Sequence, residues 1–332
     1  MNLQKLEKTL SDQPKYRRAQ AQQAIFKLLV NNWEEFTAFP KDLRDELNHE
    51  CPLEIQAEIH TEDKTKKAAI TLDDGNVIEA VLIKNVDGRH TVCVSSQVGC
   101  PLGCTFCATG KSGFKRNLTA LEIVSQVLLF ARELKKQDDR VDNVVFMGMG
   151  EPLLNWFEVK KSIEMLNDKD GINIAARSIS VSTCGLPDGI RELMKFPLQI
   201  NLALSLHAPN DELRRELMPI ANSYGLKELL AVLNLYMKEK GRKVMFEYVM
   251  IDNVNDSMNY AEELIKMFKS LPRNLIMVNL IPYNPTGGFK ASPAPVIKKF
   301  RDTLIRGGIE ATIRESFGSR IGGACGQLAG KK

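Results

Sequence analysis

Apolar residues near the start of the chain recur with the spacing of helices. Residues 19–30 carry them at helical intervals, a break follows at Phe39-Pro40, and residues 41–47 begin another helix. The chain then changes its pattern within about ten residues. We therefore expect residues 1–52 to form a small N-terminal helical accessory domain.

The period of the apolar residues changes to two at about residue 54 and stays so until about residue 95. Alternation of this kind predicts half-buried strands, and the pairs Asp74-Gly75 and Asp87-Gly88 are turn signals between them. We expect residues 53–92 to form a β-rich bridge that leads into the rest of the chain.

Strand-like apolar runs alternate with amphipathic helical segments in residues 93–332. Repeated βα units with right-handed crossovers curl a parallel sheet into a full or partial barrel. The chemistry of such barrels sits at the carboxyl ends of the strands. The predicted strands are residues 143–147, 178–182, 199–205, 243–250 and 275–281, and the predicted helices are residues 121–134, 159–166, 226–238 and 258–269.

The composition is that of a globular protein, with 44% hydrophobic and 26% charged residues in a chain of 332. No stretch approaches a membrane span, and residues 1–8 carry charges where a secretion signal needs apolar residues. We therefore expect a cytoplasmic protein with no membrane partner. The odd number of cysteines, seven, agrees with a reducing compartment. A net charge of +4 permits an RNA partner without demanding one.

Three cysteines, Cys100, Cys104 and Cys107, form a CxxxCxxC loop. A [4Fe-4S] cluster takes one thiolate per iron, so three thiolates leave one iron open for the amine and carboxylate of S-adenosylmethionine (SAM). A structural zinc site would close with a fourth Cys or a His, and the nearest histidine, His90, lies outside the loop. A disulfide would need an oxidising compartment. We therefore predict an iron-sulfur cluster that supports radical chemistry on SAM.

Gly150 and Glu151 belong to a Gly-Met-Gly-Glu-Pro segment that directly follows a predicted strand. Such a turn lets the backbone pack closely against a ligand, and Glu151 could direct its carboxylate to the ammonium group of SAM. Taken alone, the motif is an ordinary glycine-rich turn with a surface glutamate. Its place one strand after the cysteine loop favours the binding role. Phe106, inside that loop, is either a core aromatic residue or a contact for adenine.

Polar residues also end three other predicted strands. They are Ser182, the run Ser205-Leu206-His207, and Asn284. A buried histidine with satisfied hydrogen bonds is the usual explanation of a residue such as His207. Together these residues make a ring of hydrogen-bonding groups suited to a ribose and a carboxylate. We predict that they line the SAM pocket.

Cys325 lies among glycines in the sequence Ile-Gly-Gly-Ala-Cys-Gly-Gln-Leu. A structural cysteine normally sits in packed apolar surroundings. A thiol on a mobile loop suits a nucleophile that takes a methyl group and later presents it to a substrate. Cys93, on the predicted strand before Cys100, is a candidate second reactive thiol, although a core position explains it when taken alone. We assign Cys51 and Cys184 to packing.

These motifs together resemble the radical-SAM RNA adenine methyltransferase family, which includes RlmN and Cfr. Val98 and Pro152 are closer to the C2-methylating RlmN branch than to the C8-methylating Cfr branch. The resemblance implies an α/β fold with a radical-SAM partial (β/α)6 barrel after the helical domain and the bridge. It extends over nearly the whole chain, and the matching segments are residues 92–100, 104–107, 147–155, 203–209, 279–285 and 324–328.

The resemblance also implies a mechanism that uses two SAM molecules. Cys325 takes the methyl group of the first, and a radical generated from the second removes a hydrogen from it, so that a methylene radical adds to adenine C2. By similarity, Glu79 accepts the C2 proton and Cys93 resolves the adduct by forming a disulfide with Cys325. External reductant then restores both thiols. The strand pattern alone would place Glu79 on a solvent-facing position.

The implied substrates are an adenosine in the peptidyl transferase centre of 23S rRNA and the adenosine next to the anticodon in tRNA. Residues 1–52 would then bind RNA, a flavodoxin or ferredoxin system would donate electrons, and we expect a monomer. One alternative is C8 methylation of the same rRNA adenosine. Another is a non-catalytic iron-sulfur RNA-binding protein, which would need neither Cys325 nor a SAM pocket. Residues 319–323 depart from the family pattern because they lack its acidic residues and second alanine.

Overall fold

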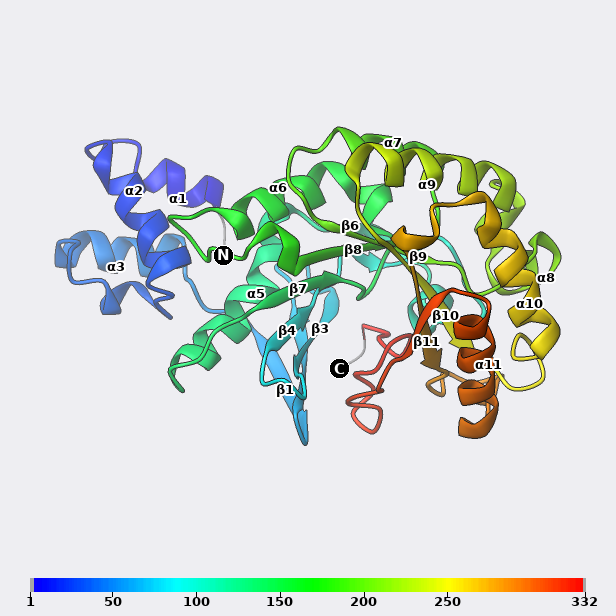
Figure 1. The fold of residues 1–332 in the computed structure, drawn as a ribbon. Helices are drawn as coiled ribbons and strands as arrows, with labels where there is room; N and C mark the ends of the chain where they lie inside the picture. Colours follow the sequence, from blue (N-terminus) through cyan, green and yellow to red (C-terminus); the bar gives the residue numbers. More distant parts are fainter. Residues whose placement is uncertain (1–2, 331–332) are drawn as a thin grey trace.

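The computed structural model describes residues 3–330, and its centre is one curved sheet of ten strands (Figure 1). The strand order is β1-β2-β3-β4-β7-β8-β9-β10-β11-β12. Neighbouring strands from β4 to β12 run parallel, and those from β1 to β4 run antiparallel. The predicted bridge and the predicted barrel are therefore parts of a single sheet.

The N-terminal helices gather beside α5, at one end of the molecule (Figure 1). Their core includes Trp33, which is fully buried and whose Nε1 donates to the Cys51 carbonyl at 2.8 Å. Arg132 of α5 joins this region to the barrel through a 2.8 Å hydrogen bond to the Leu53 carbonyl. The elements are α1 (Leu3–Thr9), α2 (Tyr16–Gln22), the π-helix η1 (Gln23–Lys27), the 3-10 helix η2 (Trp33–Glu35) and α3 (Lys41–Glu50).

β4 belongs to both parts of the sheet. Its Cys93 pairs with Val81 of β3 in antiparallel register and with Val145 of β7 in parallel register. The boundary expected between residues 92 and 93 therefore falls inside a strand. The strands of this part are β1 (Ala57–Glu62), β2 (Thr65–Thr71), β3 (Val77–Lys84) and β4 (His90–Cys93).

The parallel part confirms the predicted partial (β/α)6 barrel. Within residues 3–330, β7, β8, β9, β10 and β11 are each followed by helix, and β4 leads to α5 through an insertion that holds the small second sheet. β12 (Glu310–Ile313) adds a further parallel strand at the edge. The other strands are β7 (Asn143–Phe146), β8 (Ile179–Thr183), β9 (Asn201–Ser205), β10 (Val244–Met250) and β11 (Ile276–Pro282).

The helices pack their apolar faces on the outside of this sheet. α5 shows why: a capping box of Thr119 and Glu122 starts it, and Ile123, Val127 and Phe130 on one face are fully buried. No helix within residues 3–330 has the length and apolar character needed to cross a membrane. The helices are α5 (Ala120–Lys135), α6 (Trp156–Asn167), α7 (Pro187–Lys195), α8 (Asp211–Leu217), α9 (Leu226–Lys240), α10 (Met258–Met267) and α11 (Ala294–Arg306), with 3-10 turns η3 (Pro152–Asn155), η4 (Ala176–Ser178), η5 (Pro219–Asn222), η6 (Phe268–Ser270) and η7 (Arg273–Leu275).

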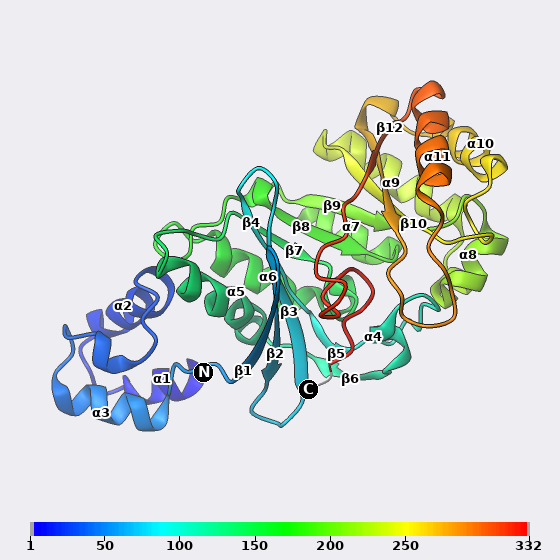
Figure 2. The ribbon, with the colours of Figure 1, turned by 90° about the horizontal axis from the view of Figure 1, so that it is seen from below.

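The segment after β12 crosses the open side of the barrel. Arg314 N–H donates to the Leu280 carbonyl of β11 at 2.8 Å, and Arg320 N–H donates to the carboxylate of Glu62 on β1 at 3.0 Å. In both views this red segment lies in the concavity of the sheet (Figures 1 and 2). Residues 314–330 therefore connect the two edges of the sheet and enclose its interior.

Candidate active site at the barrel mouth

The cysteine loop lies between β5 (Gln97–Gly99) and α4 (Ala108–Lys111), with β6 (Phe114–Asn117) paired to β5. Gly99 has φ +75°, and a Cβ there would lie 1.8 Å from the Gly113 carbonyl oxygen, so no larger residue fits. Next to it, Cys100 N–H donates to that same carbonyl at 2.9 Å. These contacts bend the chain back so that the cysteines share one loop.

The three loop thiols have different electrostatic surroundings. Burial raises the pKa of Cys100 to about 12 and also raises that of Cys107. The pKa of Cys104 is lowered because the Cys184 thiol donates a hydrogen bond to it and Arg214 adds positive charge. Cys184 therefore does more than fill space, and its assignment to packing alone is wrong.

The donor set fits a [4Fe-4S] cluster. Three soft thiols act on one another electrostatically, and thiolates are the ligands that such clusters take. Beside them Arg214 is fully buried, and its Nε and Nη1 have no hydrogen-bond partner within residues 3–330. A buried cation without a partner suits a neighbouring anion. In the same part of the chain, no three His, Cys, Asp or Glu side chains are grouped to hold a single metal ion.

Glu151 is buried and ties two strand ends together. Its carboxylate accepts the N–H of Leu153 at 3.1 Å and that of Cys184 at 2.7 Å, while burial raises the pKa of Glu151. Gly150 precedes it with φ +101°, and a Cβ there would lie 2.6 Å from the Gln97 Cβ. Both residues therefore have a structural role. The Glu151 carboxylate has further acceptor positions that could take the SAM ammonium group, and that contact stays a prediction.

The ends of β8 and β9 bring together most of the predicted SAM-binding ring. The hydroxyls of Ser182 and Ser205 are 3.5 Å apart, and the Leu206 side chain is fully buried. His207 has φ +57°, and its Nδ1 accepts the N–H of Val249 at 3.0 Å. Burial lowers the pKa of His207 to about 3, so its imidazole is neutral. Because Nδ1 is the acceptor, the proton is on Nε2.

Phe106 of the cysteine loop directly contacts His207, one of the predicted SAM-binding residues. Its aromatic side chain meets His207 edge to face, with ring centroids 4.8 Å apart. The backbone of Phe106 is held as well, because the Thr286 hydroxyl donates to its carbonyl at 2.9 Å. The cysteine loop and the strand ends therefore form one continuous surface. Phe106 also packs against a small buried cluster that includes Leu102 and Leu213, so a core position and a contact for adenine both fit it.

The Cys325 loop is fixed to the same surface by hydrogen bonds on both sides. Asn284 Nδ2 donates to the Cys325 carbonyl at 3.1 Å. Ala108 N–H, the first residue of α4, donates to the Gly326 carbonyl at 2.8 Å. Asn284 therefore reaches Cys325 as well as the barrel mouth, a contact that the sequence did not predict.

Cys325 is near both Cys93 and Cys107, the last thiol of the cysteine loop. Burial raises the pKa of Cys93, and the nearby Cys325 raises it further. Burial likewise raises the pKa of Cys325, with contributions from Glu247 and Cys107. The Cys325 side chain still reaches solvent, although protein surrounds it on several sides. Both Cys93 and Cys325 are free thiols in this structure.

Glu79 of β3 faces the C-terminal segment and is only 2% exposed. One carboxylate oxygen accepts the N–H of Ala329 at 2.6 Å and that of Gly330 at 3.0 Å, and the other pairs with Lys67 Nζ at 3.0 Å. The solvent-facing position suggested by the strand pattern is therefore wrong. The reason is that residues 314–330, far away in sequence, cover this face of the sheet.

A row of interior polar residues was missed by the sequence reasoning. Glu247, Asn279 and Thr312 occupy matching positions on β10, β11 and β12. Asn279 Nδ2 donates to Glu247 at 2.8 Å, and the Thr312 hydroxyl donates to Asn279 at 2.9 Å. Burial raises the pKa of Glu247. The signal was present in the sequence for two of them, because Glu247 and Asn279 interrupt the apolar runs of β10 and β11.

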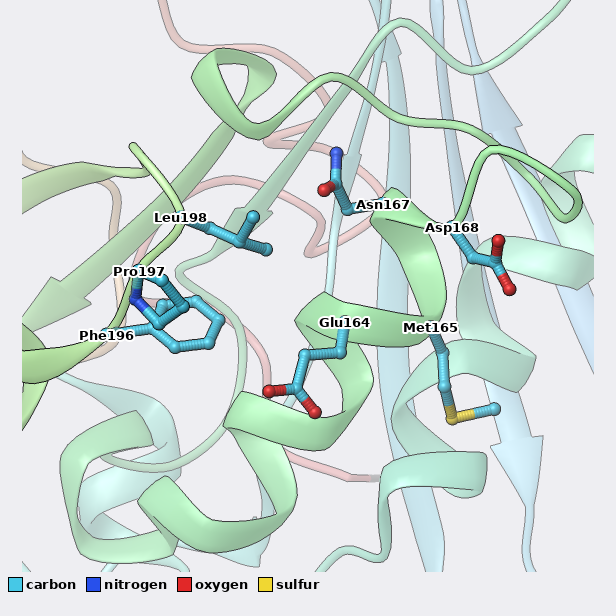
Figure 3. A pocket seen from close by; sticks show the side chains of 7 residues that line it. All are labelled: Glu164, Met165, Asn167, Asp168, Phe196, Pro197 and Leu198. Atoms are coloured by element: carbon cyan, nitrogen blue, oxygen red, sulfur yellow. The ribbon is translucent and has the colours of Figure 1, made fainter.

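A hollow of about 460 Å³ lies elsewhere on the molecule (Figure 3). It opens between the end of α6, at Glu164 and Asp168, and residues 196–198 before β9. These residues lead into β8 and β9, so the hollow is at the amino edge of the parallel strands. Glu151 follows β7, and Ser205 and His207 lie at the end of β9, so these residues are at the opposite, carboxyl edge, and we place the site there.

Comparison with known proteins agrees with this geometry. Residues 94–267 match the model of the Radical SAM superfamily. A probable dual-specificity RNA methyltransferase RlmN from Clostridium novyi is 42% identical over 324 residues, covering 96% of this chain and 92% of that relative. One from Dictyoglomus thermophilum is 44% identical over 320 residues, covering 95% and 91%.

A solved structure extends the likeness to the whole fold. The crystal structure of a radical SAM methyltransferase from Sphaerobacter thermophilus has a TM-score of 0.93 and 41% sequence identity, covering 100% of this chain and 98% of that one. The cysteine loop, Ser182 and His207 fall inside the region that the family model matches, and Asn284 lies after it. The chain therefore belongs to the radical SAM superfamily and, within it, to the family of the RlmN RNA methyltransferases.

Proposed function

We propose that this protein methylates C2 of an adenosine in the peptidyl transferase centre of 23S rRNA and C2 of the adenosine next to the anticodon in tRNA. The observation that carries the proposal is the position of Cys325, between Cys93 and the cysteine-loop thiol Cys107. A protein that only bound RNA and a cluster would not need a solvent-exposed thiol here in addition to the three thiols of the cysteine loop. The printed names of the relatives support the RNA substrate class.

Cys100, Cys104 and Cys107 would hold a [4Fe-4S] cluster, which supplies one-electron cleavage of SAM when it is bound. Around it, Gly150, Glu151, Ser182, Ser205, Leu206, His207 and Asn284 would position SAM. His207 is suited to this task because it is neutral and its Nε2 carries the proton, so it can donate a hydrogen bond without adding charge. Leu206 is buried, and its N–H donates to the Glu247 carbonyl at 3.0 Å, so it would shape the wall of the pocket.

Cys325 would act as the methyl carrier. Its raised pKa favours the thiol over the thiolate, so the attack on a SAM methyl group requires loss of a proton from sulfur. Cys325 is close enough to Cys93 to raise the pKa of Cys93, and this proximity supports the role of Cys93 as the resolving thiol. Glu79 would accept the proton from adenine C2, and Lys67 would stabilise its charged form.

The remaining partners follow from the same chemistry. A low-potential donor of the flavodoxin or ferredoxin class would supply electrons, and external thiols would reduce the Cys93-Cys325 pair after each turnover. We propose that the protein acts as a monomer in the reducing cytoplasm, with residues 1–52 contributing to RNA binding. The odd number of cysteines in the chain, seven, is consistent with that compartment.

The test is product analysis after anaerobic reconstitution of the cluster. A 23S rRNA fragment and a tRNA transcript are incubated separately with enzyme, SAM and a low-potential reductant, then digested to nucleosides for mass spectrometry. Both substrates should yield 2-methyladenosine that co-elutes with its standard. The 8-methyladenosine standard detects the Cfr-like alternative, and no methylated adenosine from either RNA would refute the proposal.

A further inference from the structure

Arg214 is a fully buried arginine on α8, directly beside the cysteine loop. It is 0% exposed, whereas Arg215, its neighbour in sequence, is exposed. The helix is attached to the loop through Thr105, whose N–H donates to the Leu217 carbonyl at 3.0 Å. α8 therefore holds the Arg214 side chain against the residues that would bind the cluster.

The Arg214 guanidinium is only partly satisfied by protein. Nη2 donates to the Cys184 carbonyl at 2.6 Å, but Nε and Nη1 have no hydrogen-bond partner within residues 3–330. The groups that act on its charge are Cys184, Cys104 and Asp211. Asp211 is engaged elsewhere, since its carboxylate accepts the N–H of Leu226 at 2.8 Å. The two unpartnered nitrogen atoms, Nε and Nη1, are therefore available to a group bound beside Cys104 and Cys184.

Burial of a cation without a partner is costly, and proteins normally compensate it with an anion and hydrogen bonds. Three thiolates outweigh the positive charge of an oxidised [4Fe-4S] core, so the bound cluster is an anion. Uptake of one electron makes it more negative. A fixed positive charge nearby stabilises the reduced state more than the oxidised state. Hydrogen bonds to cluster sulfurs act in the same direction.

We propose that Arg214 is a positioning residue whose buried guanidinium lies against the Cys104 side of the cluster and raises the cluster's reduction potential. In this step the cluster gains one electron and a donor of the flavodoxin or ferredoxin class loses one, with no proton transferred. The proposal rests on the cluster of the proposed function and is independent of the RNA substrate. It explains why Arg214 is buried with its charge, which the single hydrogen bond to the Cys184 carbonyl does not explain.

A structural bracket between α8 and the end of β8 is the competing explanation, and three variants separate the two. Arg214→Gln keeps an amide that can donate to the Cys184 carbonyl but removes the charge. Arg214→Lys keeps both a donor and the charge. Arg215→Gln removes the same charge from the exposed side of the same helix and is the matched control.

The experiment is a redox titration of the reconstituted proteins, without RNA, followed by electron paramagnetic resonance of the reduced cluster. For Arg214→Gln we expect the ratio of reduced to oxidised cluster at a fixed potential to fall about tenfold, which is about 59 mV toward lower potential for one electron. Arg214→Lys and Arg215→Gln should stay near the parent value. Iron content and circular dichroism of each variant are measured in parallel.

An unchanged potential in Arg214→Gln would overturn the proposal. If Arg214→Gln folds but binds no cluster, cluster binding by Arg214→Lys supports a requirement for charge, and loss of the cluster in both variants refutes it. If both Arg214 variants fail to fold, the role is structural and the proposal is wrong. Failure of RNA methylation leaves these readouts unaffected, so the two proposals are tested separately.

Discussion

The carboxylate of Glu79 accepts the backbone N–H of Ala329 at 2.6 Å, which joins β3 to the segment that carries Cys325. Gly330 N–H binds the same oxygen at 3.0 Å, and Lys67 pairs with the other. The group that is expected to take a proton from the substrate is therefore occupied when no RNA is present. Entry of an adenine must exchange at least one of these partners for the substrate.

Glu79→Gln should separate this anchoring from proton transfer. The amide oxygen can still accept an N–H from the C-terminal segment, but the side chain no longer acts as a base. We expect methyl transfer to Cys325 to continue while formation of 2-methyladenosine falls by about 10²-fold or more, the usual contribution of a general base. A covalent protein-RNA adduct should accumulate on denaturing gels.

Glu62→Gln is the matched control for Glu79→Gln. Glu62 also accepts N–H groups of the C-terminal segment, from Arg320 at 3.0 Å and Ile321 at 3.4 Å, but it lies on β1, away from the thiols. Its variant should turn over at nearly the parent rate. Equal losses in the two variants would mean that Glu79 acts only by anchoring the segment.

Cys93 and Cys325, the two thiols that the mechanism uses outside the cysteine loop, should give different defects when they are removed singly. Cys325→Ala loses the methyl acceptor, so it should bind the cluster and SAM but transfer no methyl group. Cys93→Ala should still methylate Cys325 and attack RNA, then remain covalently attached because nothing resolves the adduct. Gel electrophoresis of Cys93→Ala, with and without ribonuclease, detects this species.

Two results would count against that sequence of events. An active Cys325→Ala protein would exclude the methyl-carrier role altogether. A Cys93→Ala protein that turns over normally and carries no RNA would exclude the resolving role, despite the proximity of the two thiols in the structure.

Cys104 and Cys184 touch through their thiols, yet only Cys104 should be a ligand. Cys104→Ala should lose the cluster and all methylation, because two thiolates do not hold a cubane. Cys184→Ala removes a hydrogen-bond donor and should retain about four irons per chain. Iron and sulfide analysis after anaerobic reconstitution gives the answer. Retention of the full cluster by Cys104→Ala would place a ligand outside the predicted loop.

His207 should make stability depend on pH in the acidic range. Its pKa is about 3 in the folded protein, against 6.5 for the ordinary side chain, so below pH 6.5 the unfolded state binds more protons. The stability is present above pH 6.5 and is lost as the pH falls toward 3. Between pH 6.5 and 5 we expect a loss on the order of 2 kcal/mol from this residue.

His207→Asn is the comparison for this pH effect. Asparagine tolerates positive φ and offers an oxygen to the Val249 N–H, but it does not titrate. Urea unfolding at pH 6.5 and pH 5 should show a smaller loss for the variant than for the parent protein. Equal losses would show that other groups cause the acid sensitivity.

Sequence was sufficient where a property is local. The loop of Cys100, Cys104 and Cys107 could be predicted because its ligands lie within eight residues, and the βα repeat because each element carries its own apolar period. The burial of Glu79 and the contact of Arg214 with the loop could not be predicted. Both depend on segments that are distant in sequence, and no periodicity encodes which of them will meet.

Single polar residues inside apolar strands are partly predictable: the sequence shows that they are unusual but does not show their partners. Asn279 and Glu247 each interrupt an apolar run, which marks them as residues with a buried task. Only the register between β10 and β11 reveals that they are partners. A prediction of both strand order and register would have been needed to find this pair before the structure.

The closure of the barrel by residues 314–330 also bears on how the chain folds. Glu79 and Ala329 are separated by 250 residues, and Glu62 and Arg320 by 258. Contacts between such distant positions are slow to form, because loop closure costs entropy before the contacts repay it. Refolding should therefore build the helices and central strands first, and the amide of Ala329, which donates to Glu79, should become protected from hydrogen exchange only in the last kinetic phase.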